Sequence, residues 1–186
     1  MSSHQASPPR PVPESYWVIP AQFLAGEYPG TPYFAELTRQ RLDLFLAAGF
    51  DTFMDLTTPG EIEPYEPLLR EQAAYYNLSV QYTRFPIRDF SLPQPAQMTT
   101  TLNAIQSALT AGRKLYLHCH GGIGRTGTVV GCYLVRQGLT GQQALGQLAA
   151  WWQHVPKSSR YPHSPETFQQ EQFVREWHIY EQRAKP

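Results

Sequence analysis

The chain of 186 residues has little cysteine, no excess of either charge and no long apolar run. Two cysteines are too few for a disulfide framework or a four-cysteine zinc site. The 15 Lys and Arg residues balance the 15 Asp and Glu residues, so an extended basic face for nucleic acid is not expected. No apolar run approaches the roughly 20 residues that cross a bilayer. We therefore expect a cytoplasmic, monomeric protein without nucleic-acid or membrane partners.

The N-terminal part of the chain differs in composition from the rest. Four of the first 13 residues are proline, and few of the others could be buried. Residues 1–13 are therefore predicted to form a disordered, proline-rich arm. They hold no apolar segment of the kind found in secretory leaders, so none is expected. Residues 14–186 are long enough to bury a core and are predicted to form a single domain.

Short apolar runs alternate with helical patterns over this domain. Strands are predicted over 16–19, 23–25, 51–56, 79–85 and 114–118. Helices are predicted over 32–48, 66–76, 96–111, 126–136, 140–152 and 164–183, with Thr31 and Ser164 as helix starts. The alternation favours an α/β fold, with a mostly parallel central sheet of about four to five strands flanked by helices. The helix over 126–136 is apolar or small on nearly all sides, which predicts a central, buried helix.

One glycine-rich segment, between the last core strand and this central helix, has the residues of a binding or catalytic site. Its sequence from residue 118 to 127 is H-C-H-G-G-I-G-R-T-G. Glycines let successive backbone N–H groups turn inward at the N-terminus of a helix, which forms a cradle for an anion. An arginine fork can hold two phosphate oxygens together. The predicted phosphate-binding residues are His120, Gly121, Gly122, Ile123, Gly124 and Arg125.

Cys119 lies at the mouth of this cradle. A free cysteine thiol has a pKa near 8.5, and neighbouring N–H groups or a guanidinium can lower such a pKa to about 3.5–7.5. The thiolate is the nucleophilic form of cysteine. A thiolate at the base of an anion trap predicts attack on the phosphorus of a phosphate ester.

The pattern H-C-x-x-G-x-x-R-T resembles the signature of the cysteine-dependent protein tyrosine phosphatases. The region from about residue 16 to 183 resembles their small dual-specificity-type branch. The run P-I-R-D-F-S-L-P over 86–93 resembles the general-acid loop of that branch, with Asp89 placed 30 residues before Cys119. Residues 167–173 resemble the glutamine-bearing start of the last helix of the family, which points to Gln170.

The resemblance implies a two-step reaction on phosphorylated proteins or peptides, without a metal or other cofactor. Cys119 attacks the phosphoryl group while Asp89 donates a proton to the leaving oxygen of tyrosine, and also of serine or threonine. Water then hydrolyses the phosphocysteine, with Asp89 as the base. Arg125 holds the phosphoryl oxygens, and Thr126 aids departure of the thiolate. His118 is expected to support the loop from a buried position.

Several residues near these segments allow more than one interpretation of their role. Asp51 and Asp55 are the other acids near a strand end, although neither lies on a loop. A metal site at residues 118–120 is not expected, because adjacent side chains converge poorly on one ion. Cys132 is interpreted as a core residue. Gln170 either positions a water or is a solvated helix residue. Lys157 and Arg160 either bind a second anionic group or lie on a solvated basic loop, and the second interpretation is favoured.

Two other functions remain as alternatives. A phosphatase of inositol phosphates or phosphoinositides would share this chemistry, but the family members of that kind place lysines inside the cradle, and this loop has none. A catalytically inactive phosphate-binding module would use the same loop without turnover. Such modules lack the cysteine, the arginine or the acid, and this chain has all three.

Overall fold

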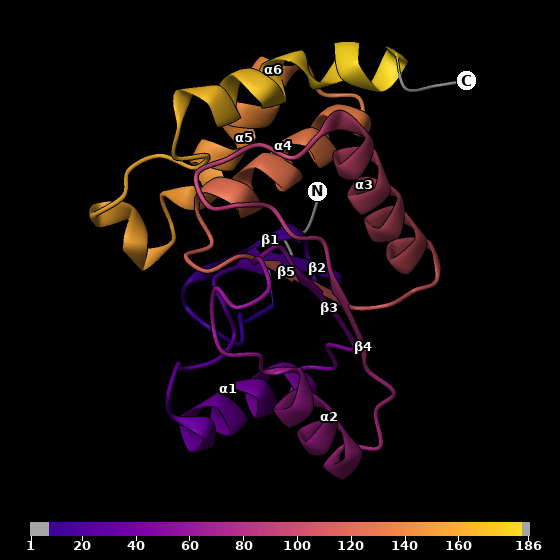
Figure 1. Cartoon of the computed structure of the whole chain (residues 1–186), viewed down its shortest axis with the longest axis vertical. Helices are drawn as coiled ribbons and strands as arrows, with labels where there is room; N and C mark the ends of the chain where they lie inside the picture. Colours follow the sequence, from indigo (N-terminus) through magenta and orange to yellow (C-terminus); the bar gives the residue numbers. More distant parts are fainter. Residues whose placement is uncertain (1–7, 184–186) are drawn as a thin grey trace, which may run out of the picture.

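The computed structural model of the protein describes residues 8–183 and has a five-stranded sheet between two layers of helices (Figure 1). The strands are β1 (Ser15–Ile19), β2 (Phe23–Gly26), β3 (Thr52–Asp55), β4 (Gln81–Arg84) and β5 (Leu115–His118), in the order β1-β2-β5-β3-β4. Only β1 and β2 pair antiparallel, and the other neighbours are parallel. The prediction of a mostly parallel α/β sheet is confirmed.

The helices cover the two faces of the sheet unequally. Helices α1 (Ala35–Ala47) and α2 (Glu66–Tyr75) lie on one side in Figure 1. On the other side lie α3 (Pro95–Thr110), α4 (Gly124–Arg136), α5 (Gly141–Trp152) and α6 (Phe168–Arg183). In β5, Leu115 and Leu117 join the core under the larger layer, whereas Tyr116 joins the core under α1 and α2. This alternation follows from the two-residue period of a strand buried on both faces.

Helix α4 is the central helix of the larger layer, as predicted. Twelve of its 13 residues, from Gly124 to Val135, are buried. It begins two residues earlier than predicted, because the Gly127 N–H already donates to the Ile123 carbonyl at 3.1 Å and closes a first helical turn. At Gly131, a Cβ atom would lie 2.7 Å from a methyl group of Val174, so the glycine allows α6 to pack closely.

The predicted start of the first helix is wrong. Helix α1 begins at Ala35, three residues after Pro32. The Thr31 N–H donates to the Thr38 hydroxyl oxygen at 2.9 Å, and that hydroxyl donates to the Thr31 carbonyl. Thr31 is therefore tied to the second turn of the helix from outside it, and Tyr33, with φ at +67°, interrupts a continuous helix between them.

The predicted start of the last helix is also wrong. The Ser164 hydroxyl donates to the carbonyl of Ile123 at 2.8 Å, so it anchors a connecting segment to the glycine-rich loop. Helix α6 begins at Phe168. The hydroxyl oxygen of Thr167 accepts the N–H of Gln170 at 3.2 Å, which is the side-chain cap that the sequence assigned to Ser164.

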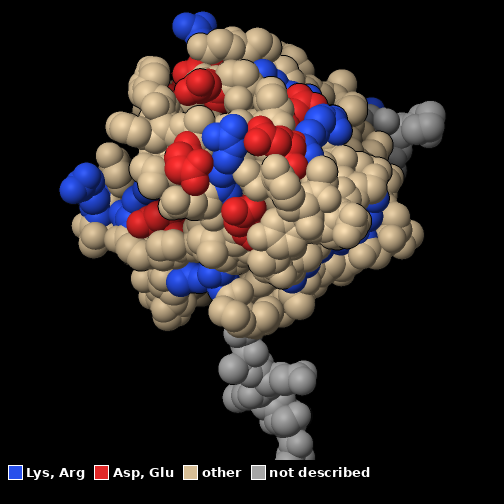
Figure 2. Space-filling view, turned by 90° about the horizontal axis from the view of Figure 1, so that it is seen from below, with Lys and Arg blue, Asp and Glu red and all other residues tan. Residues whose placement is uncertain are grey.

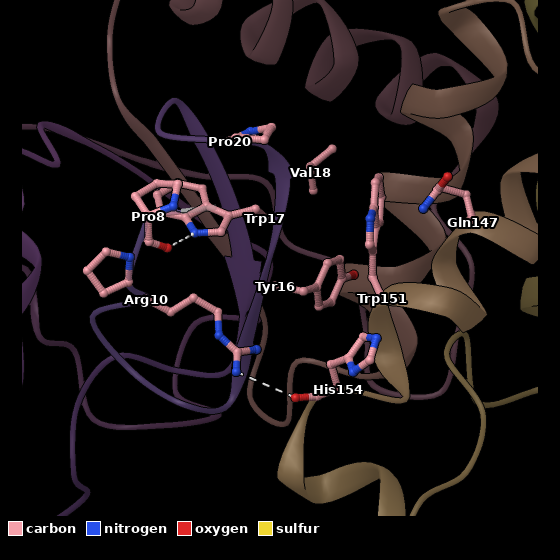
Figure 3. Close-up of a pocket in the computed structure, with 10 residues that line it drawn as sticks. Pro8, Arg10, Tyr16, Trp17, Val18, Pro20, Gln147, Trp151 and His154 are labelled. Carbon is pink, nitrogen blue, oxygen red and sulfur yellow. Dashed lines mark hydrogen bonds between the residues drawn. The ribbon is translucent and has the colours of Figure 1, made fainter. Parts of the chain in front are cut away.

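The N-terminal segment packs against β1 from Pro8 onward (Figure 3). The indole N–H of Trp17 donates to the Pro8 carbonyl at 2.8 Å, and Val12 is buried. The predicted disordered arm is therefore wrong over residues 8–13, because one side chain of this segment joins the core and its backbone satisfies the indole. Residues 1–7 of the predicted arm lie outside the described residues.

Opposite charges are interleaved on the side of α1 and α2, which Figure 2 shows from below. Arg39 pairs with Glu71 of the neighbouring helix at 3.3 Å, and Arg70 pairs with Glu66 one turn away at 2.8 Å. These exposed pairs are worth little stability each, but they break the face into small patches of alternating sign. Across residues 8–183, the helices are too short or too polar to cross a bilayer.

Candidate active site

The loop after β5 begins at the carboxyl end of the strand, level with the carboxyl ends of the parallel strands β2 and β3. Cys119 is 2% exposed at its base, and the Gly122 N–H donates to its sulfur at 3.2 Å. Gly122 has φ at +75°, and a Cβ atom there would lie 2.5 Å from the Gly26 carbonyl carbon. Only glycine meets both conditions, so this position lets the loop fold back over the cysteine.

The carbonyl groups of this loop bond to groups outside it. The Tyr28 N–H donates to the His120 carbonyl at 3.0 Å, and the Ser164 hydroxyl donates to the Ile123 carbonyl. Because these carbonyls face outward, the loop can direct its N–H groups toward a bound anion, as a backbone nest does. The Thr126 hydroxyl, predicted to assist the thiolate, donates to the Gly26 carbonyl at 3.4 Å and ties the helix start to β2.

His118 supports the loop from the buried side, as predicted. Its Nδ1 lies 3.0 Å from the Cys119 carbonyl, and its Nε2 lies 2.8 Å from the Tyr65 hydroxyl. A carbonyl only accepts, so Nδ1 carries the proton, and Nε2 of the neutral ring accepts from the Tyr65 O–H. Burial lowers the pKa of His118 below its ordinary value, which is consistent with a neutral ring.

Arg125 is 2% exposed and is held by Glu61, a residue that the sequence analysis missed. Its Nη1 and Nη2 donate to the two Glu61 carboxylate oxygens at 2.8 and 2.6 Å, and Nη1 also donates to the Ile87 carbonyl. Burial would lower the pKa of Arg125, but the hydrogen bonds that it donates to Glu61 and the charge of Cys119 raise it. The Nε atom is buried without a partner in the described part of the chain, so it is available to an anion.

Asp89 reaches the same guanidinium from an exposed loop. One of its carboxylate oxygens lies 3.0 Å from Arg125 Nη2 and accepts the N–H of Phe90 at 3.1 Å. Phe90 has φ at +55°, so the loop turns sharply just after the acid. The structure thus brings together Cys119, Arg125 and Asp89, which the sequence placed in two separate segments.

The two alternative acids do not face this cleft. Asp55 is 1% exposed, pairs with Arg84 at 2.9 Å and accepts the Tyr82 hydroxyl at 2.6 Å. Burial would raise the pKa of Asp55, but the hydrogen bonds that it accepts from the Tyr82 and Thr57 hydroxyls and from the Thr57 N–H lower it, so it stays ionised. Asp51 lies at the other end of β3, where its carboxylate accepts the Lys114 N–H.

A cleft of about 340 Å³ opens above the cysteine. Besides the loop itself, it is lined by Glu27, Asp89, Phe90, Lys157, Tyr161 and Glu166. The Lys157 ammonium donates to a Glu27 carboxylate oxygen at 2.5 Å and to the Gly121 carbonyl at 3.0 Å. The favoured prediction of a solvated basic loop is therefore wrong for Lys157, whereas Arg160 is exposed as expected.

Gln170 is buried under the cleft and is not a solvated helix residue. Its side-chain carbonyl accepts the N–H groups of Glu166 and Thr167, each at 3.3 Å. A Cβ atom on Gly124 would lie 2.1 Å from Glu166 Oε1 and 2.8 Å from Gln170 Oε1, so the loop, the connecting segment and the start of α6 meet at this glycine. Cys132 is fully buried in the core, in agreement with its interpretation.

Glu27, Glu61, Tyr65 and Glu166 lie on segments that the motif does not include. The one signal in the sequence was that Glu27 and Glu61 follow strands β2 and β3, whose carboxyl ends lie level with that of β5. In doubly wound parallel sheets, the carboxyl ends of the strands are where ligand-contacting residues gather.

Comparison with known proteins gives one family. Residues 13–174 match the family model PTP-SAK, described as "Swiss Army Knife protein, DSP-PTPase phosphatase domain". The chain is 28% identical over 101 residues to the mouse "Protein tyrosine phosphatase domain-containing protein 1", covering 50% of this chain and 13% of that protein. It is 35% identical over 74 residues to the Arabidopsis thaliana "Phosphatidylglycerophosphate phosphatase PTPMT2", covering 39% and 32%.

The chain thus spans about a third or less of these relatives. Among solved structures, the fold is similar to that of Tk-PTP in its active form. The TM-score is 0.64 at 24% identity, over 92% of this chain and 98% of that chain. At that identity, the similarity concerns the fold.

Proposed function

The chain belongs to the PTP-SAK family of DSP-PTPase phosphatase domains, and from that premise we propose that it hydrolyses phosphate monoesters on tyrosine residues of proteins or peptides. The single observation that carries the proposal is the position of Cys119. Its sulfur accepts a loop N–H at the base of a cleft, beside a buried guanidinium with a free Nε. We propose residues 14–186 as the catalytic domain.

In the first step, the thiolate of Cys119 attacks phosphorus, and the bond between phosphorus and the ester oxygen breaks. Asp89 donates a proton to the leaving oxygen, which its place on the exposed rim permits. The loop N–H groups and Arg125 stabilise the charge on the three equatorial oxygens. In the second step, water attacks phosphorus and gives a proton to the Asp89 carboxylate, the phosphorus–sulfur bond breaks with its electron pair returning to Cys119 as the thiolate, and inorganic phosphate leaves.

Glu61 prepares Arg125 for this task. Two parallel hydrogen bonds fix the plane of the guanidinium before substrate arrives. Asp89 shares Nη2 of the same group at 3.0 Å, so the acid loop and the phosphate-binding arginine are already in register. A preorganised site of this kind spends little free energy on reorganisation during the reaction.

The exposed side chains around the mouth of the cleft, its rim, suit an aromatic leaving group. Phe90 and Tyr161 line the cleft and are 65% and 45% exposed. Exposed aromatic side chains beside a phosphate cradle offer stacking and apolar contact to a tyrosine ring. The rim also carries the carboxylates of Asp89 and Glu166, and Lys157 is paired with Glu27. This arrangement disfavours an inositol polyphosphate, which would bring further negative charges to the rim.

The two cysteines of the chain are free thiols, and both are buried. Free thiols persist in reducing compartments, which supports a cytoplasmic location for the proposed enzyme.

A substrate panel tests the proposal. We expect the wild-type protein to show its highest kcat/KM on phosphotyrosine peptides, with lower values on phosphoserine peptides, inositol polyphosphates and phosphatidylglycerophosphate. Cys119→Ser is expected to abolish turnover and to retain binding of inorganic phosphate, because the cradle remains intact. A higher kcat/KM on an inositol phosphate or lipid would transfer the proposal to that class. No turnover of any substrate would indicate a phosphate-binding module.

A further inference from the structure

One peptide unit of the phosphate loop is held at both of its ends. The unit joins Gly121 to Gly122, and its N–H, that of Gly122, donates to the Cys119 sulfur at 3.2 Å. Its carbonyl, that of Gly121, accepts a hydrogen bond from the Lys157 ammonium at 3.0 Å. A trans peptide unit is planar, and its N–H and C=O point in opposite directions. A contact that fixes the carbonyl therefore also fixes the direction of the N–H that reaches the cysteine.

The orientation of this peptide unit is weakly set by the loop itself. The unit lies between two glycines, which have no Cβ atom to restrict rotation of the backbone. The neighbouring carbonyls of His120 and Ile123 are held by neutral donors, a backbone N–H and a hydroxyl. Within the described part of the chain, the donor to the Gly121 carbonyl is the Lys157 ammonium alone. The direction of the Gly122 N–H therefore depends on this one side chain.

Lys157 is itself fixed by its surroundings. Its ammonium donates to one carboxylate oxygen of Glu27 at 2.5 Å, and the other oxygen of that carboxylate accepts from Arg41 at 2.7 Å. Its backbone N–H donates to a carboxylate oxygen of Glu14 at 3.1 Å. Both the backbone and the ammonium of Lys157 are thus tied to the segments around β2, so the contact with the loop carbonyl is part of a fixed network.

The charge of Lys157 adds to this geometric effect. A hydrogen bond from a charged donor is stronger than one between neutral groups. Hydrogen bonds in a chain polarise one another, so a cation on the Gly121 carbonyl makes the Gly122 N–H a stronger donor. A thiolate accepts such a bond better than a thiol does. The contact with Lys157 therefore favours the ionised form of Cys119, although the ammonium is bound to Glu27 and the loop rather than to the sulfur.

We propose that Lys157 is a positioning residue that orients the peptide unit between Gly121 and Gly122 and so stabilises the Cys119 thiolate, an inference that rests on the proposed function. Lys157 acts through the peptide unit, and Cys119 remains the group that reacts. Every phosphate ester meets the same nucleophile. Loss of Lys157 should therefore lower the rate equally for all leaving groups.

Ultraviolet absorbance measures the Cys119 thiolate directly, because a thiolate absorbs light that a thiol does not. The absorbance of each variant is compared with that of the same variant carrying Cys119→Ser. At the pH where half of wild-type Cys119 is ionised, Lys157→Met is expected to show about a fifth of the wild-type thiolate signal, since loss of one such hydrogen bond weakens the hold on the thiolate roughly tenfold. At the same pH, kcat/KM should fall by a similar factor for every member of a series of substituted phenyl phosphates.

Two further variants separate the contact from the charge. Lys157→Arg keeps a charged donor and should retain most of the thiolate signal. The matched control is Arg160→Met, which removes the same charge three residues further on, where the side chain is exposed, and should keep the wild-type signal and kcat/KM. Denaturant unfolding of each variant checks that it is folded.

Three results would overturn the inference. They are a wild-type thiolate signal in Lys157→Met, a signal in Lys157→Arg as low as that in Lys157→Met, and an equal loss in Arg160→Met, which would mean that the charge acts without the contact. Each of these leaves the proposed function intact, since the wild-type enzyme still turns over. A wild-type protein that forms the thiolate but releases no phenol from an aryl phosphate would instead overturn the proposed function.

Discussion

The two sides of the phosphate loop are built differently. On the buried side, which we call the base, side chains are fixed by short, specific contacts; it comprises Glu61, Tyr65, His118, Gly122 and Arg125. On the open side, which we call the rim, side chains are exposed to solvent; it comprises Asp89, Phe90, His120, Tyr161 and Glu166. The base has one geometry to keep, whereas the rim can vary with the substrate.

This difference in structure corresponds to two different functions, transfer of the phosphoryl group and selection of the leaving group. Every phosphate monoester presents the same three oxygens to the base, so the base sets how well the phosphoryl group is held and transferred. Leaving groups differ in size, charge and basicity, and they meet only the rim. Changes in the base should therefore affect all substrates equally, and changes in the rim should depend on the substrate. Three predictions test this separation, in order of decreasing effect.

The largest effect is expected from Arg125→Lys in the base. Lysine keeps the charge but loses the planar fork and cannot satisfy both oxygens of Glu61. We expect kcat/KM to fall about 1,000-fold, because an oxyanion donor of this kind contributes roughly that much to the rate. Kinetics on a series of substituted phenyl phosphates should show the same loss for each member. A loss that varied with the leaving group would contradict the assignment of Arg125 to the base.

A smaller, selective effect is expected from Asp89→Asn on the rim. The amide cannot donate a proton to the leaving oxygen, so kcat should fall about 100-fold for a basic leaving group and much less for p-nitrophenol. The basic limb of the pH profile should flatten at the same time. Measurement of kcat against leaving-group pKa checks both points. An unchanged pH profile would assign the acid to another residue.

The smallest effect is expected on the pH dependence of folding stability, and it distinguishes the two histidines that flank Cys119. Burial lowers the pKa of His118 in the folded protein, whereas the unfolded chain binds a proton below about pH 6.5. The unfolded state thus binds more protons at pH 5 to 6.5, and stability falls there as the pH falls, by at most about 1.4 kcal/mol per pH unit. Denaturant titrations should show this slope in wild type and in His120→Gln, but not in His118→Gln. An identical slope in all three would contradict the assignment.

The sequence predicted the phosphate loop itself better than the side chains around it, and the reason is contiguity. The loop, its glycines, Cys119 and Arg125 follow one another in ten residues, so local backbone chemistry is enough to read them. Asp89 was found because its own loop resembles a known pattern at a known offset. The parallel sheet was predicted because strand and helix patterns alternate along the chain.

The residues that sequence analysis missed reach the site from distant segments. Glu61 and Tyr65 belong to the connection after β3, and Glu166 belongs to the segment before α6. The residues next to each of them in the sequence give no sign that these segments meet at the carboxyl ends of β2, β3 and β5. The N-terminal segment was misread for a different reason: Trp17 is only nine residues from Pro8, but its indole meets the Pro8 carbonyl only once β1 is folded into the sheet.

Trapping of the covalent intermediate tests the central claim most directly. Wild-type protein is mixed with an aryl phosphate, quenched in the millisecond range and digested, and the phosphorylated peptide is mapped by mass spectrometry. We predict phosphate on Cys119 in wild type and none in Cys119→Ser. Turnover with no phosphate on Cys119, or phosphate on another side chain, would contradict the account.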